Sequence, residues 1–91
     1  MTYETTMVTV NTHILQERFR QNVKWGKQNH SNGRWLAILG EEFGEVCEAM
    51  QQGSIASKET DANNLYEELI HVAAVASAFA EQVLRDGITQ G

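Results

Sequence analysis

Residues 40–48 read Gly-Glu-Glu-Phe-Gly-Glu-Val-Cys-Glu, and this acidic stretch decides how the rest of the chain is interpreted. It places four carboxylates within about two turns of a helix. Glutamates three or four residues apart share one face, and each such pair costs about 0.2–0.5 kcal/mol through repulsion. Such crowding indicates a bound cation. The alternative is a helix whose acids extend into solvent or pair with Lys and Arg.

The apolar residues around this stretch recur with the spacing of a helix. Glu42 falls between Trp35 and Ile38 on a helical wheel, and Glu45 falls just beyond Ile38, so we expect Glu42 at the edge of the core. A carboxylate there must be neutralised, paired or bound to a metal. The apolar arc consists of Trp35, Leu39, Phe43, Val46 and Met50, flanked by Ile38 and Ala49.

Size and composition limit the possible classes of protein. With 91 residues, 42% of them hydrophobic, the chain suits one small domain, and a domain of this size gains stability from oligomerisation. The 12 acidic and 7 basic residues give a formal net charge of −5, which argues against binding to nucleic acid polymers or anionic membranes. No apolar run approaches the roughly 18 residues that a transmembrane helix needs.

The N-terminus and the single cysteine indicate a cytoplasmic protein. Residues 1–10 have neither the basic nor the apolar region of a secretory signal. Cys47 is the one cysteine of the chain and cannot form an internal disulfide, which fits a reducing compartment. Because Cys47 lies on the apolar side of its helix, we expect a buried thiol.

Glycines and polar segments divide the chain into three main helices, which predicts an all-α fold. Asn11 or Thr12 caps the first helix and Asp61 caps the third. Residues 1–10 have a strand-like composition without a partner strand, so we expect a flexible arm before a single helical domain of residues 11–91. The helices span about residues 11–24, 34–52 and 61–85, with a polar loop at 25–33 and a link at 53–60.

The sequence predicts burial of three residues in the first helix and close approach at two glycines in the second. Leu15, Phe19 and Val23 have the spacing of residues that a first helix buries. Gly40 and Gly44 lie inside the second helix, where each glycine costs about 1 kcal/mol of helix stability. We therefore expect these glycines to permit close approach of another backbone or of a ligand.

The third helix is apolar on most of its surface. Glu68 lies inside its apolar arc, and His71 lies one step further round on the same side. A helix that is apolar nearly all round must be enclosed by others, and three helices cannot enclose one of their own number. We expect a homodimer or homotetramer that completes a four-helix-bundle-like core. The arc consists of Leu65, Leu69, Val72, Ala76, Phe79 and Val83.

Two helices thus direct acidic groups toward one interior, Glu42 with Glu45 and Glu68 with His71. Oxygen-rich sites suit a hard cation such as Mg²⁺ or Mn²⁺, which keeps several waters and binds substrate phosphates. A metal of this kind bridges phosphate oxygens and lowers the pKa of an attacking water. The residues therefore suggest hydrolysis of a phosphoanhydride.

The same residues resemble a known family. Glu41-Glu42-x-x-Glu45, followed by Glu68-x-x-His71, is similar to the signature E-E-x-x-E, spacer, E-x-x-D of the MazG-like all-α nucleoside triphosphate pyrophosphohydrolases. Residues 20–26, Arg-Gln-Asn-Val-Lys-Trp-Gly, also resemble the segment before that signature in small, often phage-associated members. The likeness extends over about residues 15–85.

The resemblance implies a function and roles for the acids. It implies Mg²⁺-dependent cleavage of a (d)NTP to the monophosphate and pyrophosphate by a helical dimer or tetramer. Glu42, Glu45 and Glu68 would be metal ligands and catalytic residues, and Glu41 would assist the metal or the water.

His71 departs from the signature, which has Asp at this position. Imidazole is a weaker ligand for Mg²⁺ and shifts preference toward Mn²⁺, Zn²⁺ or iron. His71 is either a fourth metal ligand, a group that contacts the ligands or the substrate, or a polar residue at the edge of the bundle.

The substrate phosphates need cations, and the chain offers several near the loop at 25–33. We expect Lys24 and Lys27 to bind them, with ordinary surface roles as the alternative. Trp25 either stacks on a nucleobase or covers the core as a lid, and His30 is a candidate substrate contact. Arg18, Arg20, Arg34 and Asn29 are further candidates.

Two other classes of protein fit the sequence. Glu68-x-x-His71 is the element that ferritin-like di-iron proteins use on two helices, although one copy per chain requires symmetry-related partners. A degenerate, non-catalytic module that binds nucleotide or another protein would explain the missing Asp.

Overall fold

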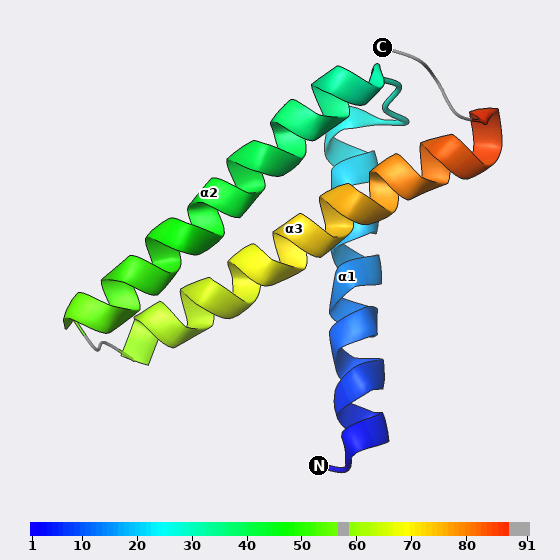
Figure 1. Cartoon of the computed structure of the whole chain (residues 1–91). Coiled ribbons are helices and arrows are strands. Elements are labelled where there is room, and N and C mark those ends of the chain that lie inside the picture. The colour runs from blue at the N-terminus through cyan, green and yellow to red at the C-terminus, as the bar shows by residue number, and fades with distance from the viewer. Residues whose placement is uncertain (57–58, 88–91) are drawn as a thin grey trace.

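A computed structural model shows three helices, α1 (Tyr3–Trp25), α2 (Asn32–Ala56) and α3 (Glu59–Asp86) (Figure 1). The structure describes the backbone of residues 1–56 and 59–87, and the side chains of 1–51 and 64–87. Within these ranges there is no strand, which confirms the all-α prediction. No helix of the described chain is long and apolar enough to cross a membrane.

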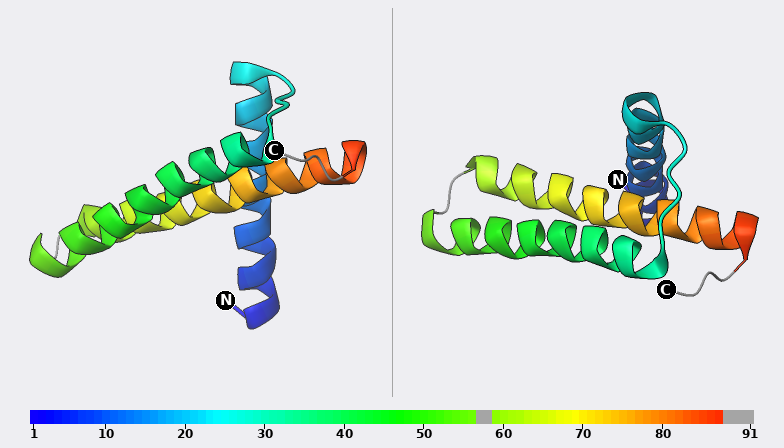
Figure 2. Two further views of the ribbon diagram at one scale, coloured as in Figure 1. Left: turned by 45° about the horizontal axis from the view of Figure 1, so that its top comes forward. Right: turned by 90° about the horizontal axis from the view of Figure 1, so that it is seen from above.

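The helices form two layers. α2 and α3 lie side by side as an antiparallel hairpin, and α1 crosses behind α3 at a steep angle (Figures 1 and 2). α1 packs on α3, and no backbone contact joins it to α2 within the described residues. α3 is therefore the central helix, because it alone touches both of the others.

α1 begins eight residues earlier than the sequence predicts. The Thr2 side chain caps it by accepting a hydrogen bond from the Thr5 amide at 3.1 Å. The Thr6, Thr9 and Thr12 hydroxyls then donate to carbonyls one turn back, at 2.7–2.9 Å. The prediction of a flexible arm at residues 1–10 is wrong, because α1 already begins at Tyr3 and these threonines bond along the helix.

The other helix ends agree with the sequence to within a few residues. Gly26 ends α1 with a φ of 70°, a left-handed conformation that glycine adopts without strain. The Ser31 hydroxyl accepts from the Arg34 amide at 3.1 Å at the start of α2. The predicted link at 53–60 is shorter than expected, since α2 reaches Ala56 and α3 starts at Glu59. Residues 57–58 and the side chain of Asp61 lie outside the described part.

A small core fills the space between α3 and its two neighbours. Trp35 is 1% exposed and stacks on Phe79 with ring centroids 5.5 Å apart. The remaining buried apolar residues are Val46 and Ala49 on α2, and Ile70, Ala74 and Val75 on α3. The prediction that Trp35 belongs to the core is confirmed.

Several apolar residues predicted to be buried are exposed. Phe43 and Met50 are 61% and 57% exposed, because only the arc of α2 that faces α3 is covered. The Cys47 thiol is exposed for the same reason, so its predicted burial is wrong in the single chain. Leu15, Phe19 and Val23 of α1 are exposed as well.

One side of the hairpin carries apolar side chains and no charge. On α3, Tyr66 and Glu81 form hydrogen bonds with side chains of α1. Phe79 and Gln82 contact Trp35 of α2. The third side of α3 faces solvent. Because the two helices are antiparallel, the solvent-facing apolar arcs of both point to the side away from α1. We call this surface the uncharged face; its exposed members are Leu36, Phe43 and Met50 of α2 and Leu69, Ala76 and Ala80 of α3.

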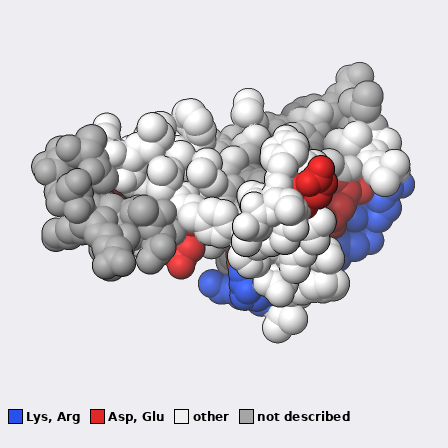
Figure 3. Space-filling view, turned by 90° about the horizontal axis from the view of Figure 1, so that it is seen from below, with Lys and Arg blue, Asp and Glu red and all other residues white. Residues whose placement is uncertain are grey.

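Charged side chains lie elsewhere. Among residues 32–51 and 64–87, no Lys, Arg, Asp or Glu falls on the arcs of the uncharged face. Seen from the N-terminal end of α1, acidic and basic side chains lie next to one another in small groups, and most of the remaining described surface carries no charge (Figure 3).

Candidate metal centre and adjoining cleft

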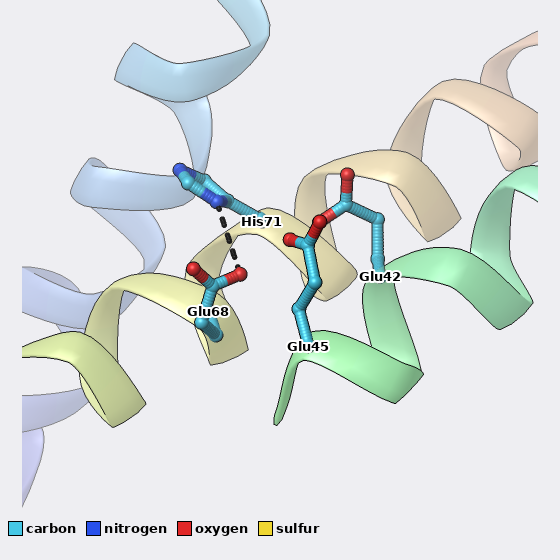
Figure 4. A group of neighbouring side chains, drawn as sticks. All are labelled: Glu42, Glu45, Glu68 and His71. Carbon is cyan, nitrogen blue, oxygen red and sulfur yellow. Dashed lines mark ion pairs between the residues drawn. The ribbon is translucent and has the colours of Figure 1, made fainter. Parts of the chain in front are cut away.

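The structure brings together the four residues predicted to bind metal. Glu42 and Glu45 come from α2, Glu68 and His71 from α3, and each pair spans one helical turn. One ligand atom from each residue lies within 4.8 Å of the others. All four side chains point into the space between the two helices (Figure 4). Three carboxylates and an imidazole around one point are a suitable donor set for a divalent cation.

Two oxygens in this group are buried without a hydrogen-bond donor, Oε2 of Glu42 and Oε2 of Glu68. Burial is the main cause that raises the pKa of Glu42, followed by the charge of Glu45. Burial likewise raises the pKa of Glu68, with the neighbouring Glu45 adding to it. An ionised carboxylate in this position requires a positive charge, and a metal ion supplies one.

His71 directs its two ring nitrogens to different acids. Nδ1 lies 3.5 Å from Oε2 of Glu68, inside the cluster (Figure 4). Nε2 lies 4.0 Å from Oε2 of Glu17 on α1, and Arg20 holds the other Glu17 oxygen at 2.8 Å. The sequence analysis did not identify Glu17. Nothing in the sequence shows that α1 crosses α3 at this turn.

The cluster opens into a cleft of about 780 Å³. All four predicted substrate contacts, Lys24, Trp25, Lys27 and His30, line this cleft. Glu41 lines it too, outside the four-residue cluster. Glu42 and His71 form part of the same wall and join the cluster to the cleft, and Arg34 adds a third cation.

Trp25 is exposed in the cleft wall and does not cover the core. Its ring is 57% exposed, and the Lys24 ammonium lies 4.7 Å from the ring centroid. The interpretation of Trp25 as a core lid is therefore wrong, since Trp35 occupies the core and Trp25 lies outside it. An exposed aromatic ring beside cations is a surface on which a planar base can stack.

Two buried amides near the cleft carry no obvious sequence signal. Gln21 of α1 accepts a hydrogen bond from Arg18 Nη1 at 2.9 Å and lines the cleft. Gln82 of α3 is 3% exposed and bonds to Trp35 and His30. Both were overlooked because glutamine at a single helical position is most often a surface residue.

The expectation for Gly40 and Gly44 is not met inside this chain. A Cβ atom at either position would have no other atom of the described chain within 4 Å. Whatever approaches these glycines therefore comes from outside the described residues.

Comparison with protein families, with curated proteins and with solved structures found no match for this chain.

Proposed function

We propose that this protein is a metal-dependent nucleoside triphosphate pyrophosphohydrolase that converts a (d)NTP to the (d)NMP and pyrophosphate. The observation that carries the proposal is the junction of the acidic cluster with a cleft that also presents Lys24, Lys27 and Arg34; Glu42 and His71 belong to both the cluster and the cleft. The resemblance of the acidic motifs to the MazG-like signature supports the same reaction.

Glu42, Glu45, Glu68 and His71 are the residues that would hold the metal. A bound Mg²⁺ or Mn²⁺ supplies charge neutralisation at the phosphates and a water of lowered pKa. The three carboxylates also carry the negative charge that would keep such an ion in place, and two of their buried oxygens form no hydrogen bond within the described residues.

The rest of the cleft suits a nucleoside triphosphate. Lys24, Lys27 and Arg34 provide positive charge for the β- and γ-phosphates, which depart as pyrophosphate when water attacks the α-phosphate. Glu41 at the cleft wall accepts a proton from the attacking water or orients it. Trp25 offers a face for the base. A cytoplasmic location is part of this proposal.

The proposal is tested by measuring pyrophosphate release from a panel of ribo- and deoxyribonucleoside triphosphates, with Mg²⁺ and Mn²⁺ in parallel. Glu42→Gln and Glu68→Gln should reduce release to the level of the metal-free protein. Glu48→Gln is the matched control, since Glu48 is exposed on α2 and lies outside the cluster. Equal turnover in wild type and both cluster variants would disprove the metal assignment.

A second candidate follows from the imidazole in the cluster. Glu68 and His71 lie one turn apart on α3, as in ferritin-like di-iron proteins, and imidazole favours iron over Mg²⁺. Metal analysis after aerobic purification separates the two. Stoichiometric iron without any nucleotide hydrolysis would favour this candidate, whereas nucleotide binding without turnover would indicate a non-catalytic module.

We further propose that the uncharged face binds the same face of a second copy, so that two hairpins form a four-helix bundle. Over the 20 residues from 32 to 51, α2 is about 30 Å long, and two adjacent helices are about 20 Å wide, which gives roughly 600 Å² before side-chain relief is counted. A standard interface buries about 800 Å² per partner. The face thus has the size of a stable dimer interface, and Gly40 and Gly44 leave room for close approach.

A further inference from the structure

Gln82 connects three parts of the fold through one buried carboxamide. Its Oε1 atom accepts from the Trp35 indole Nε1 and from the His30 backbone amide, both at 2.9 Å. Its Nε2 atom donates to the His30 carbonyl at 2.7 Å. The side chain is 3% exposed, so these bonds are shielded from water. One residue of α3 therefore holds both backbone polar groups of His30 and the core tryptophan of α2.

The segment that Gln82 holds is the connection between α1 and α2. This segment, residues 26–31, begins at Gly26 and ends where Ser31 caps α2. A second bond fixes it one turn further along α3, where Arg85 Nη2 donates to Asn29 Oδ1 at 2.8 Å. We call residues 26–31 the clamped loop. No other polar side chain of α3 is seen to bond to it among the described residues.

The clamped loop forms one end of the cleft beside the acidic cluster. Lys27 and His30 both line that cleft. The His30 ring packs edge-on against Trp35 with centroids 4.9 Å apart, so the position of the ring follows from the same contacts that Gln82 makes. The positions of Lys27 and of the His30 ring in the cleft thus depend on Gln82, which does not itself line the cleft.

We propose that Gln82 is a positioning residue for nucleotide binding, which holds the clamped loop in the arrangement that presents Lys27 and His30 to the triphosphate. This inference rests on the proposed function. A loop that is free to leave this arrangement would bind only in the fraction of molecules that retain it, which raises the apparent dissociation constant by the reciprocal of that fraction. The acidic cluster is built from α2 and α3 and does not involve the loop, so metal affinity should be independent of Gln82.

The informative variant is Gln82→Met, which keeps the length of the side chain and removes its hydrogen bonds. The His30 amide and carbonyl then lose their partner, while the volume next to Trp35 stays filled. Gln82→Glu keeps the Oε1 acceptor and removes the Nε2 donor, so we expect an intermediate effect. Arg85→Gln, which removes the second anchor only, should also be intermediate.

Binding is measured by calorimetry with an α,β-imido deoxynucleoside triphosphate and Mn²⁺, so that no cleavage occurs. We expect Gln82→Met to bind the nucleotide about tenfold more weakly, since it loses the two hydrogen bonds that fix the loop and the one to Trp35. Its affinity for Mn²⁺ alone, followed by electron paramagnetic resonance, should stay within a factor of two of wild type. Amide hydrogen exchange should show faster exchange at residues 26–31 in the variant.

Ile70→Val controls for lost stability, because Ile70 is buried on α3 and does not line the cleft. It should lower Tm without weakening nucleotide binding. Equal nucleotide affinity in wild type and Gln82→Met, or unchanged exchange in the loop, would overturn the positioning role. Nucleotide binding by the wild-type protein is measured first. If the wild type binds no nucleotide, the proposed function and the role of Gln82 are both disproved. If the wild type binds and Gln82→Met binds equally well, only the role of Gln82 is disproved.

Discussion

Glu42 and Glu68 each bury a carboxylate oxygen that forms no hydrogen bond within the described part of the chain, although His71 Nδ1 lies 3.5 Å from that of Glu68. Burial raises the pKa of both groups in the folded protein, so folding favours their protonated forms. In the metal-free protein, the protonated forms of Glu42 and Glu68 therefore make their full contribution to the free energy of unfolding at pH values below the ordinary glutamate pKa. It is lost as pH rises through the raised, folded-state pKa values.

We accordingly expect the metal-free protein to lose Tm as pH rises above the ordinary glutamate pKa of about 4.3, and to regain it with saturating Mn²⁺, because the ion binds the ionised carboxylates. Differential scanning fluorimetry with and without EDTA tests this. Glu42→Gln should raise the metal-free Tm at pH 8 by a few degrees, since a single unpaired buried group costs about 1–3 kcal/mol, and should abolish the Mn²⁺ response. A metal-free Tm that rises with pH above that pKa would contradict the account.

We expect His71 to determine which metal the proposed site prefers. With one imidazole and three carboxylates, the site should give higher pyrophosphohydrolase activity with Mn²⁺ than with Mg²⁺. His71→Asp restores a fourth oxygen donor and should increase the activity with Mg²⁺ relative to Mn²⁺. Parallel titrations of the two ions measure the ratio. An unchanged ratio would place His71 outside the set of ligands, where its contact with Glu17 would be its main role.

The four cluster residues could be predicted from the sequence, because the geometry of a helix determines which way each side chain points. Glu42 and Glu45, like Glu68 and His71, lie one turn apart, and each pair borders an apolar arc that must face another helix. Glu17 was not predictable in the same way. Its approach to His71 depends on where α1 crosses α3, which no periodicity along the chain encodes.

At the scale of elements, α1 is the least firmly held helix, because it packs less extensively on α3 than α2 does. The Arg18 guanidinium forms a two-pronged contact with Glu81, with Nε 2.7 Å from Oε2, and also reaches Gln21. This contact is the main polar link between the two helices in the described part, beside those of His13 with Tyr66 and of His71 with Glu17. The bond from Arg18 lowers the pKa of Glu81, so the pair weakens as pH falls through that lowered value.

Arg18→Met should therefore loosen α1 more than it destabilises the hairpin. Glu81 is half exposed, so we expect a loss of about 1 kcal/mol in the free energy of unfolding. Hydrogen exchange should accelerate in α1 and stay close to wild type in α2 and α3. Lys24→Met, which removes an exposed cation from the same helix, is the control. Equal acceleration in all three helices would show that α1 does not open on its own.

The sequence predicted the existence and type of the helices better than their first and last residues. α2 and α3 follow from strong apolar periodicity and clear breaks. The start of α1 was missed because threonine and valine favour strands in general, whereas here Thr2, Thr6 and Thr9 bond within a helix. Gln82 was missed because its partners are distant in the sequence: His30 of the loop lies 52 positions away and Trp35 of α2 lies 47 positions away.

At the scale of the whole molecule, the single chain leaves much of its predicted core uncovered. Phe43, Met50 and Leu69 belong to the apolar arcs of the sequence analysis, yet between about half and two thirds of each is exposed. The arcs lie on α2 and α3 as the sequence predicted, and a single chain leaves part of each arc uncovered. The acidic cluster and the adjoining cleft lie on the other side of the hairpin, toward α1, so a partner on the uncharged face would leave the cleft open.

Light scattering coupled to size-exclusion chromatography should therefore give the mass of a dimer, or of a tetramer built from such dimers. Phe43→Lys places a charge near the centre of the uncharged face, and burying it should weaken association by at least about 2 kcal/mol, roughly thirtyfold in the dissociation constant. Val23→Lys is the matched control, since Val23 is 89% exposed on α1, away from that face. Because association stabilises the folded chain by mass action, Tm should rise with protein concentration in wild type and in Val23→Lys, but much less in Phe43→Lys. A monomeric wild-type protein with a Tm independent of concentration would show that the uncharged face serves another partner.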